Sequence, residues 1–137
     1  IGALVGLVLS LGGDVTLIGY GKMHHMAMQA AEGLQDDDID AEVIDLRTLR
    51  PWDKETIMNS VSRTHHAVVV EECPPTSGVA AEVAANIYEQ VFDELDAPVE
   101  RVSGEDVPLP YAKELEQSCI PGPEDVAAAA RKALSLE

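Results

Sequence analysis

Residues 67–87 read AVVVEECPPTSGVAAEVAANI, and this stretch decides the fold. Its first four residues form a nearly continuous apolar run, which is typical of a β-strand covered on both faces. A loop containing two prolines follows. Ser77 and Gly78 then precede a helix whose apolar side chains recur every four residues, at Val79, Val83, Ile87 and Val91. A buried strand that leads into an amphipathic helix predicts a layered α/β structure.

The flanking sequence repeats this alternation. Residues 14–20 (DVTLIGY), 41–46 (AEVIDL) and 99–102 (VERV) are predicted strands. A helix is predicted between the first two, because its apolar side chains share one helical face: Met23, Met26, Ala27, Ala30, Ala31 and Leu34. Further helices are predicted after Asp53, which suits an N-cap, over residues 111–117, and from about Pro123.

The resulting order, β-α-β-α-β-α-β-α, predicts the fold class. Strands that alternate with helices form a mostly parallel sheet covered by helices on both faces. We therefore expect an α/β protein, a three-layer α/β/α sandwich with a central sheet of about five strands. Residues 15–19, 42–46 and 67–71 are the predicted central strands.

The predicted domain spans residues 14–135, and both ends of the chain are interpreted separately. Residues 1–13 form an apolar N-terminal segment, which we interpret as a fragment start or a linker. Its apolar part is too short to cross a bilayer, which takes about 20 residues, and it lacks the basic start of a signal peptide. An opening Ile1 is typical of a fragment or a processed product, and the closing residues 136–137 are typical of a vector scar.

Charge and cysteine content limit the partners and the compartment. The formal net charge is −16, from 25 acidic and nine basic residues. Nucleic acid and anionic membrane surfaces are thus excluded as expected partners, because both bind Lys and Arg. Cys73 and Cys119 belong to no C-x-x-C pattern and are interpreted as reduced thiols, although a disulfide between them stays open. We expect a cytoplasmic protein, or one of the mitochondrial matrix or plastid in a eukaryote.

The carboxyl ends of the predicted strands are where an α/β fold would carry chemistry. The turn at residues 19–22 (GYGK) has no third glycine and no Walker lysine-serine pair. Arg47 and Arg50 are candidates for clamping an anion, but pairing with neighbouring carboxylates is the favoured interpretation. Glu71 and Glu72 are adjacent on a strand, so their side chains point to opposite faces; we expect one buried and hydrogen-bonded, the other in solvent.

The histidines occur as two adjacent pairs, at residues 24–25 and 65–66. Neighbours on a helix diverge by about 100°, so neither pair forms a chelating face, and no H-E-x-x-H spacing exists. No G-x-S-x-G elbow is present either. The residues alone therefore predict an α/β/α domain without a self-sufficient catalytic constellation, which favours a module that serves a larger enzyme.

Four stretches resemble one family, in its order and at its spacing: DVTLIGYGKM (14–23), AEVIDLRTLRPWDKETI (41–57), VVVEECPPTSGVAAEVAANI (68–87) and LDAPVERVSGEDVPLPYAKELEQSCIP (95–121). They are similar to the C-terminal domain of the beta subunit of thiamine-diphosphate-dependent 2-oxo-acid dehydrogenases, the pyruvate and branched-chain enzymes. The resemblance implies the transketolase C-terminal-domain fold. It also implies that the parent enzyme, an oxidoreductase, decarboxylates a 2-oxo acid and transfers the acyl group to lipoyl groups.

The resemblance places the cofactor outside this chain. In such enzymes thiamine diphosphate and Mg²⁺ lie mainly on the alpha subunit. The glutamate that activates the cofactor comes from the N-terminal domain of the beta subunit. We therefore assign no catalytic, cofactor-binding or metal residue here, and we expect the chain to be inactive alone.

What the resemblance does imply is assembly, with an alpha subunit, a second beta subunit and an acyltransferase core. The stretch near the beta–beta contact matches Gly78, Val79, Ala80, Ala81, Glu82 and Val83. Small side chains there would let another backbone approach. The region of Asp96, with the C-terminal end of the chain, matches the surface that receives the peripheral subunit-binding domain of the acyltransferase. That domain is basic, which suits the acidity of this chain.

Two departures and two alternatives accompany this interpretation. Residues 1–13 are more apolar than the family's usual connection between domains, and Ser77 and Ala80 stand where the family usually has glycine.

Within the superfamily, an acetoin dehydrogenase beta subunit remains open as an alternative, whereas the DVPLPYAKELE stretch disfavours transketolase and deoxyxylulose-phosphate synthase. A free-standing anion-binding regulatory module, using Arg47 and Arg50, is the alternative from another class.

Overall fold

A five-stranded sheet forms the centre of the molecule, whose computed structural model describes residues 6–135. Its strand order is β1-β3-β2-β4-β5. Four strands run parallel: β2 (Val15–Gly19), β3 (Ala41–Asp45), β4 (Ala67–Val70) and β5 (Glu100–Val102). The fifth, β1 (Leu7–Ser10), pairs antiparallel with β3 at one edge. The predicted fold class, a mostly parallel sheet of about five strands, is confirmed.

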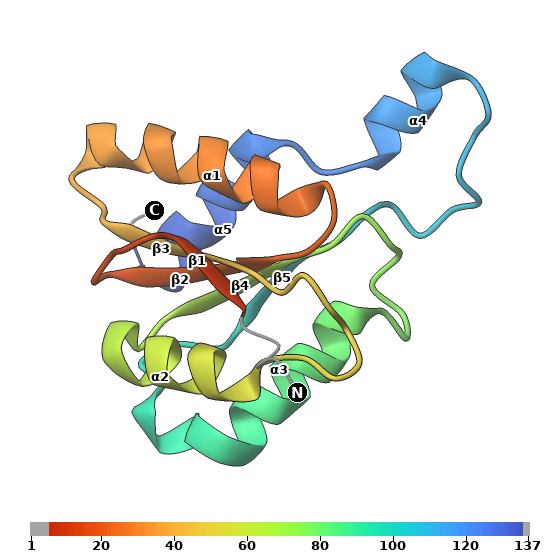
Figure 1. The fold of residues 1–137 in the computed structure, drawn as a ribbon. Helices are drawn as coiled ribbons and strands as arrows, with labels where there is room; N and C mark the ends of the chain where they lie inside the picture. The colour runs from red at the N-terminus through yellow and green to blue at the C-terminus, as the bar shows by residue number, and fades with distance from the viewer. Residues whose placement is uncertain (1–5, 136–137) are drawn as a thin grey trace.

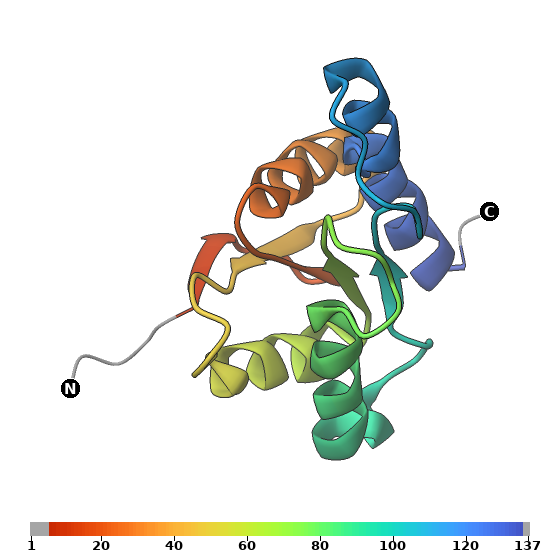
Figure 2. The same cartoon turned by 90° about the vertical axis from the view of Figure 1, so that its right-hand side faces the viewer.

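Helices cover both faces of the sheet, which gives the three predicted layers (Figures 1 and 2). One face carries α1 (Met23–Leu34) and α5 (Pro123–Ala133). The other carries α2 (Lys54–Thr64) and α3 (Val79–Val91). Single 3-10 turns, Gln35–Asp37 and Phe92–Glu94, follow α1 and α3. The short helix α4 (Lys113–Cys119) stands away from these layers in Figure 1.

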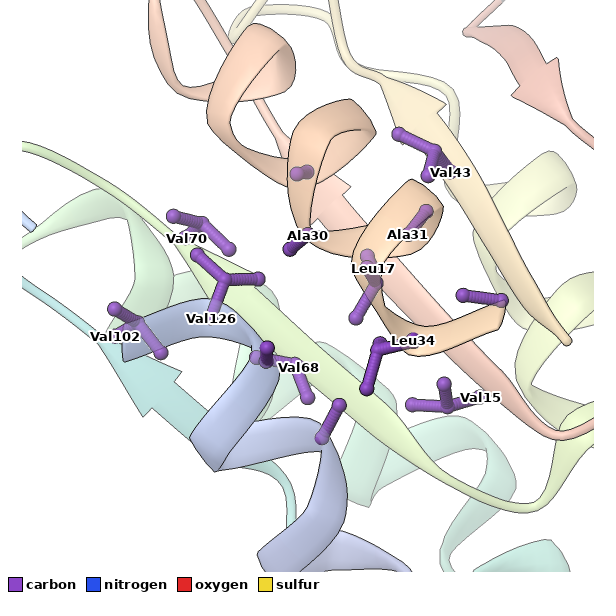
Figure 3. Packing of buried hydrophobic residues seen from close by; sticks show 14 of the residues in the cluster. Val15, Leu17, Ala30, Ala31, Leu34, Val43, Val68, Val70, Val102 and Val126 are labelled. Carbon is purple, nitrogen blue, oxygen red and sulfur yellow. The ribbon is translucent and has the colours of Figure 1, made fainter. Parts of the chain in front are cut away.

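Alternation along the strands builds one core on each face. Leu17 of β2 and Val68 of β4 point toward α1 and α5, where Figure 3 shows them among other aliphatic side chains. Their strand neighbours Ile18 and Val69 point to the opposite face, toward α2 and α3. All four side chains are fully buried, and each contributes about 1.5–3 kcal/mol relative to an exposed position.

Asp53 caps α2 and ties the N-terminal segment to it. Its Oδ1 accepts a hydrogen bond from Thr56 N at 3.0 Å, and its Oδ2 accepts from Thr56 Oγ1 at 2.7 Å and from Gly6 N at 2.9 Å. Burial by itself would raise the pKa of this carboxyl, but the three hydrogen bonds outweigh it and lower the pKa below its usual value. The predicted N-cap is thus confirmed.

Strand β1 is the main difference from the predicted order of elements. It lies within the segment interpreted as a start or linker, and it is only half-buried at the sheet edge. A Cβ on Gly12 would lie 2.3 Å from the backbone carbon of Ala41, so only glycine lets the chain leave β1 this close to β3. Smaller differences are one-residue shifts of β3 and β4 and a two-residue shift of α4. Within residues 6–135, no helix has the length and apolarity needed to span a bilayer.

Candidate functional site

Glu71 directly follows β4 at the carboxyl edge of the sheet, and its side chain is fully buried. Its Oε2 accepts a hydrogen bond from Ala80 N at 2.9 Å, and its Oε1 accepts one from Ser103 Oγ at 2.9 Å. One carboxylate therefore joins the end of β4, the first turn of α3 and the loop after β5. Glu72, the next residue, is exposed. The predicted division of this pair, one buried and bonded and one in solvent, is confirmed.

Gly78 makes this arrangement possible. A Cβ at residue 78 would lie 2.4 Å from Glu71 Oε1 and 2.6 Å from Oε2, so the carboxylate occupies the space of the missing side chain. The start of α3 also favours a negative charge, because the helix dipole and the free N–H groups point toward it. Both carboxylate oxygens of Glu71 are thus hydrogen-bonded within the domain, and neither is directed at a ligand.

Tyr20 and Cys73 meet at the same edge, with Tyr20 Oη 3.8 Å from Cys73 Sγ. Burial raises the pKa of Tyr20, and the adjacent Cys73 thiol and the charges of Glu71 and Glu72 raise it further. The phenol therefore stays protonated at physiological pH. The Tyr20 phenol is therefore no general base near neutrality.

The two candidate arginines occupy different settings. Arg47 has a left-handed backbone conformation, and its Nε lies 3.7 Å from Asp45 Oδ2. The favoured interpretation, pairing with a neighbouring carboxylate, is confirmed for Arg47. Arg50 is exposed and borders a hollow of about 660 Å³ together with Trp52, Lys54 and Glu82, and Arg47 is not among its lining residues.

The histidines bond to backbone carbonyls. His24 Nδ1 approaches Gly21 O, His65 Nδ1 lies 2.7 Å from Glu94 O, and His66 Nδ1 lies 3.0 Å from Thr64 O. The carbonyls bonded by His24 and His66 are local, whereas that of Glu94 lies 29 residues from His65; the His24 and His25 rings also lie against each other, with centroids 3.8 Å apart. Among residues 6–135, no group of three or more His, Cys, Asp or Glu side chains is placed to hold a metal ion.

The predicted beta–beta segment forms the start of α3, and the domain itself covers part of it. Ala80 and Val83 are buried in the core beneath α3, and Gly78 faces Glu71. Val79 and Ala81 are half-buried, and Glu82 is exposed. A partner can therefore reach Val79, Ala81 and Glu82, while Ala80 and Val83 support the helix from below. The interface itself stays a prediction.

Asp96 is exposed and borders a hollow of about 430 Å³ at the opposite end of α3. The loop is fixed, because Asp96 N donates to His65 O at 3.0 Å and Val99 N donates to Tyr88 Oη at 2.8 Å. The hollow is lined by Tyr88, Phe92, Leu95 and Pro98 as well as by acidic side chains. Phe92 is 68% exposed. Sequence reasoning missed this aromatic pair, although the four-residue spacing places both rings on one helical face.

The model of the family described as "Transketolase, C-terminal domain" matches residues 5–126. The chain belongs to the transketolase C-terminal domain family. The curated relatives include the mitochondrial pyruvate dehydrogenase E1 component subunit beta-1 of Arabidopsis thaliana, 48% identical over 89% of this chain and 34% of its own length. The pyruvate dehydrogenase E1 component subunit beta of Rickettsia felis is 46% identical over 91% of this chain and 38% of its own. The chain thus spans about a third of these relatives.

Solved structures share the fold. A structure described as "Split gene transketolase, inactive beta4 tetramer" has a TM-score of 0.78 and 32% identity, covering 96% of this chain and 42% of that one. Transketolase from Pichia stipitis has a TM-score of 0.59 at 18% identity, covering 95% and 18%. The second likeness concerns the fold alone. As a transketolase C-terminal domain, the chain presents structured surfaces at both ends of α3, and its buried glutamate organises the first of them.

Proposed function

We propose that this chain is the C-terminal assembly domain of the beta subunit of a 2-oxo-acid dehydrogenase, most simply a pyruvate dehydrogenase. The observation that carries the proposal is 44–48% identity to pyruvate dehydrogenase E1 beta subunits over about nine-tenths of the chain. The parent enzyme would decarboxylate its 2-oxo acid oxidatively and transfer the acyl group to lipoyl groups. The domain would support that reaction through subunit contacts.

Thiamine diphosphate and Mg²⁺ would be held by other parts of the parent enzyme. At the carboxyl edge of the sheet, Glu71 offers the cofactor no free carboxylate, because both of its oxygens accept hydrogen bonds within the domain. The turn at Gly19-Tyr20-Gly21 also lacks a glycine-rich phosphate loop. We therefore assign this domain no step in the chemistry.

The proposed partners are an alpha subunit, a second beta subunit and an acyltransferase core. A related structure is described as a tetramer of beta chains, which supports self-association in the family. Val79, Ala81 and Glu82 would contribute to the beta–beta contact. Asp96 and the neighbouring Phe92 would receive the basic peripheral subunit-binding domain, since an acidic rim around an apolar anchor suits such a partner. The compartment would be the cytoplasm, or the mitochondrial matrix or a plastid in a eukaryote.

Calorimetric titration tests both parts of the proposal. With thiamine diphosphate and Mg²⁺ we expect no binding heat, and stoichiometric micromolar binding would contradict the assembly role. With an isolated peripheral subunit-binding domain from a pyruvate dehydrogenase acyltransferase we expect binding that Asp96→Lys weakens. Asp36→Lys is the matched control, because Asp36 is also exposed but lies in the 3-10 turn after α1, outside both the Asp96 hollow and the arm. Equal loss in both variants would reduce the effect to net charge.

The alternatives differ in what they require outside this chain. An acetoin dehydrogenase beta subunit would have the same domain, and only the neighbouring genes and the substrate would separate it. A free-standing anion-binding module is disfavoured, because Arg47 pairs with Asp45. The coding region upstream of Ile1 decides: a pyrimidine-binding domain with its activating glutamate supports the dehydrogenase, and its absence supports the module.

A further inference from the structure

Residues 103–121 form an arm that leaves the layers after β5, carries α4 and returns to α5 (Figure 1). Four of the nine exposed large apolar side chains in the described chain lie on it: Val107 at 49%, Leu109 at 58%, Tyr111 at 104% and Leu115 at 58% exposed. Val107 and Leu109 line one hollow together, and contiguous exposed apolar surface marks interaction sites in folded proteins. The core accounts for none of these four side chains.

The base of the arm is fastened, because its first root bonds to the loop after β4 and its two roots bond to each other. Gly104 N donates to Cys73 O at 2.9 Å, and Glu105 N donates to Cys119 O at 2.9 Å. A Cβ on Gly104 would lie 2.3 Å from the carbonyl oxygen of Glu72, so the arm passes the loop after β4 at backbone contact. The base of the arm is therefore fixed beside the loop after β4, and the apolar side chains of the arm project from this base.

Between the arm and that loop lies a groove of about 440 Å³, here called the arm groove. Apolar walls come from Pro74 on the loop and from Val107, Pro108, Leu109 and Ile120 on the arm. The space is large enough for one or two apolar side chains. Since Leu109 remains more than half exposed, the arm groove receives a side chain without enclosing a whole small molecule.

The charge of the arm groove has one sign. Three carboxylates border it, those of Glu72, Glu105 and Glu116, and no Lys or Arg is among the described residues that line it. The whole chain carries −16, so a second copy would bring like charge against this rim. A partner with Lys or Arg beside an apolar side chain matches both features, whereas a neutral or acidic one matches only the apolar walls.

We propose that the arm groove docks a polypeptide segment of a partner that carries an apolar side chain flanked by Lys or Arg. The apolar side chain enters between Pro74 and Leu109, and the cations meet Glu72, Glu105 and Glu116. Tyr111 and Leu115 extend the apolar surface along the arm, which suits an extended polypeptide. This surface is separate from the Asp96 hollow, and the proposal does not depend on which enzyme the domain belongs to.

Cys73 and Cys119 both line the arm groove and report on its occupation. The probes are three short capped peptides: one of Lys and Leu, one with each Leu replaced by Ser, and one with each Lys replaced by Glu. We expect the Lys-Leu peptide to slow alkylation of both thiols and to shift the amide resonances of Glu72, Cys73 and the non-proline residues of 105–120. Its affinity should exceed that of the Lys-Ser peptide by at least about tenfold, the effect of one buried leucine.

Two variants locate the binding, each with a control on another surface. Leu109→Ser and Glu116→Lys should each lower the affinity several-fold, whereas Leu49→Ser and Glu89→Lys, also exposed positions, should leave it unchanged. Equal binding of the Lys-Leu and Lys-Ser peptides would overturn the proposal, since only net charge would then matter. Resonance shifts confined to other surfaces would overturn it too. Self-association that Leu109→Ser abolishes would assign the arm groove to a second copy instead.

Discussion

Replacing Gly78 by alanine should destabilise the domain through Glu71. The new Cβ would lie 2.4 Å from Glu71 Oε1, and ordinary contacts begin near 3.4 Å, so the carboxylate must move by about 1 Å. No free space receives it, because the side chain is fully buried and both oxygens accept hydrogen bonds at 2.9 Å, from Ala80 N and Ser103 Oγ. A hydrogen bond to a charged group contributes about 1.5–3 kcal/mol. Alanine also lowers the conformational entropy of the unfolded chain, which offsets about 0.4–1 kcal/mol of the lost stability.

The net loss for Gly78→Ala should therefore be about 2 kcal/mol, measured as the change in the free energy of unfolding in urea. Gly33→Ala is the control, because nothing lies within 4 Å of a Cβ there and residue 33 is in α1; it should stabilise by about 0.5–1 kcal/mol. The decisive comparison is a double-mutant cycle. With Glu71→Ala in place the clash has no partner, so Gly78→Ala should then cost nothing. An equal cost in both backgrounds would refute the reasoning.

Two further variants test the packing and the charges that support the domain. Asp53→Ala should cost about 1 kcal/mol at neutral pH through loss of the α2 cap. The folded-state pKa of Asp53 is lowered, so this stabilisation is present above the unfolded pKa of about 3.9 and is lost as the pH falls through the folded-state pKa. Unfolding curves measure this loss. The difference in unfolding free energy between variant and parent should be smaller at strongly acidic pH than at neutral pH. Arg63→Met should lower the free energy of unfolding by about 2 kcal/mol, because it leaves the buried carboxylate of Glu42 without its partner. The loss is smaller than for a fully buried pair, because the guanidinium of Arg63 is half-exposed. Adding Glu42→Met should recover most of that loss in thermal unfolding, and no recovery would mean that the pair is not the cause.

The fold was predictable because its signals are local. The apolar run at 67–70, with valine at 68–70, places side chains alternately on both faces, so a fully buried strand follows from composition alone. Glu71 continues the alternation of β4 and points toward α3, whereas Glu72 is exposed because it lies in a bend beyond the strand. Strand β1 was not predictable, since its pairing depends on the close approach that Gly12 permits to Ala41, far away in sequence.

The candidate site was predictable only in part. The helical spacing of Val79, Val83 and Ile87 already directs Val83 inward, so periodicity alone argues against Val83 as a contact residue. The bond between Glu71 and Ala80 N depends on tertiary structure, as does the hollow beside Asp96. The arm groove depends on how a proline-rich segment folds back against the loop after β4, which no local pattern encodes.

Sedimentation at increasing concentration tests the central claim, that this domain serves assembly, most directly. The parent chain should pass from monomer to two-fold dimer, with Val79, Ala81 and Glu82 in the contact. Ala81→Arg should weaken the dimer at least about tenfold, because it introduces a clash and a desolvated charge. Ala128→Arg is the matched control, an exposed alanine on α5 at the other face of the sheet, and should dimerise like the parent. A parent chain that stays monomeric throughout, or an Ala81→Arg variant that dimerises equally well, would contradict the account.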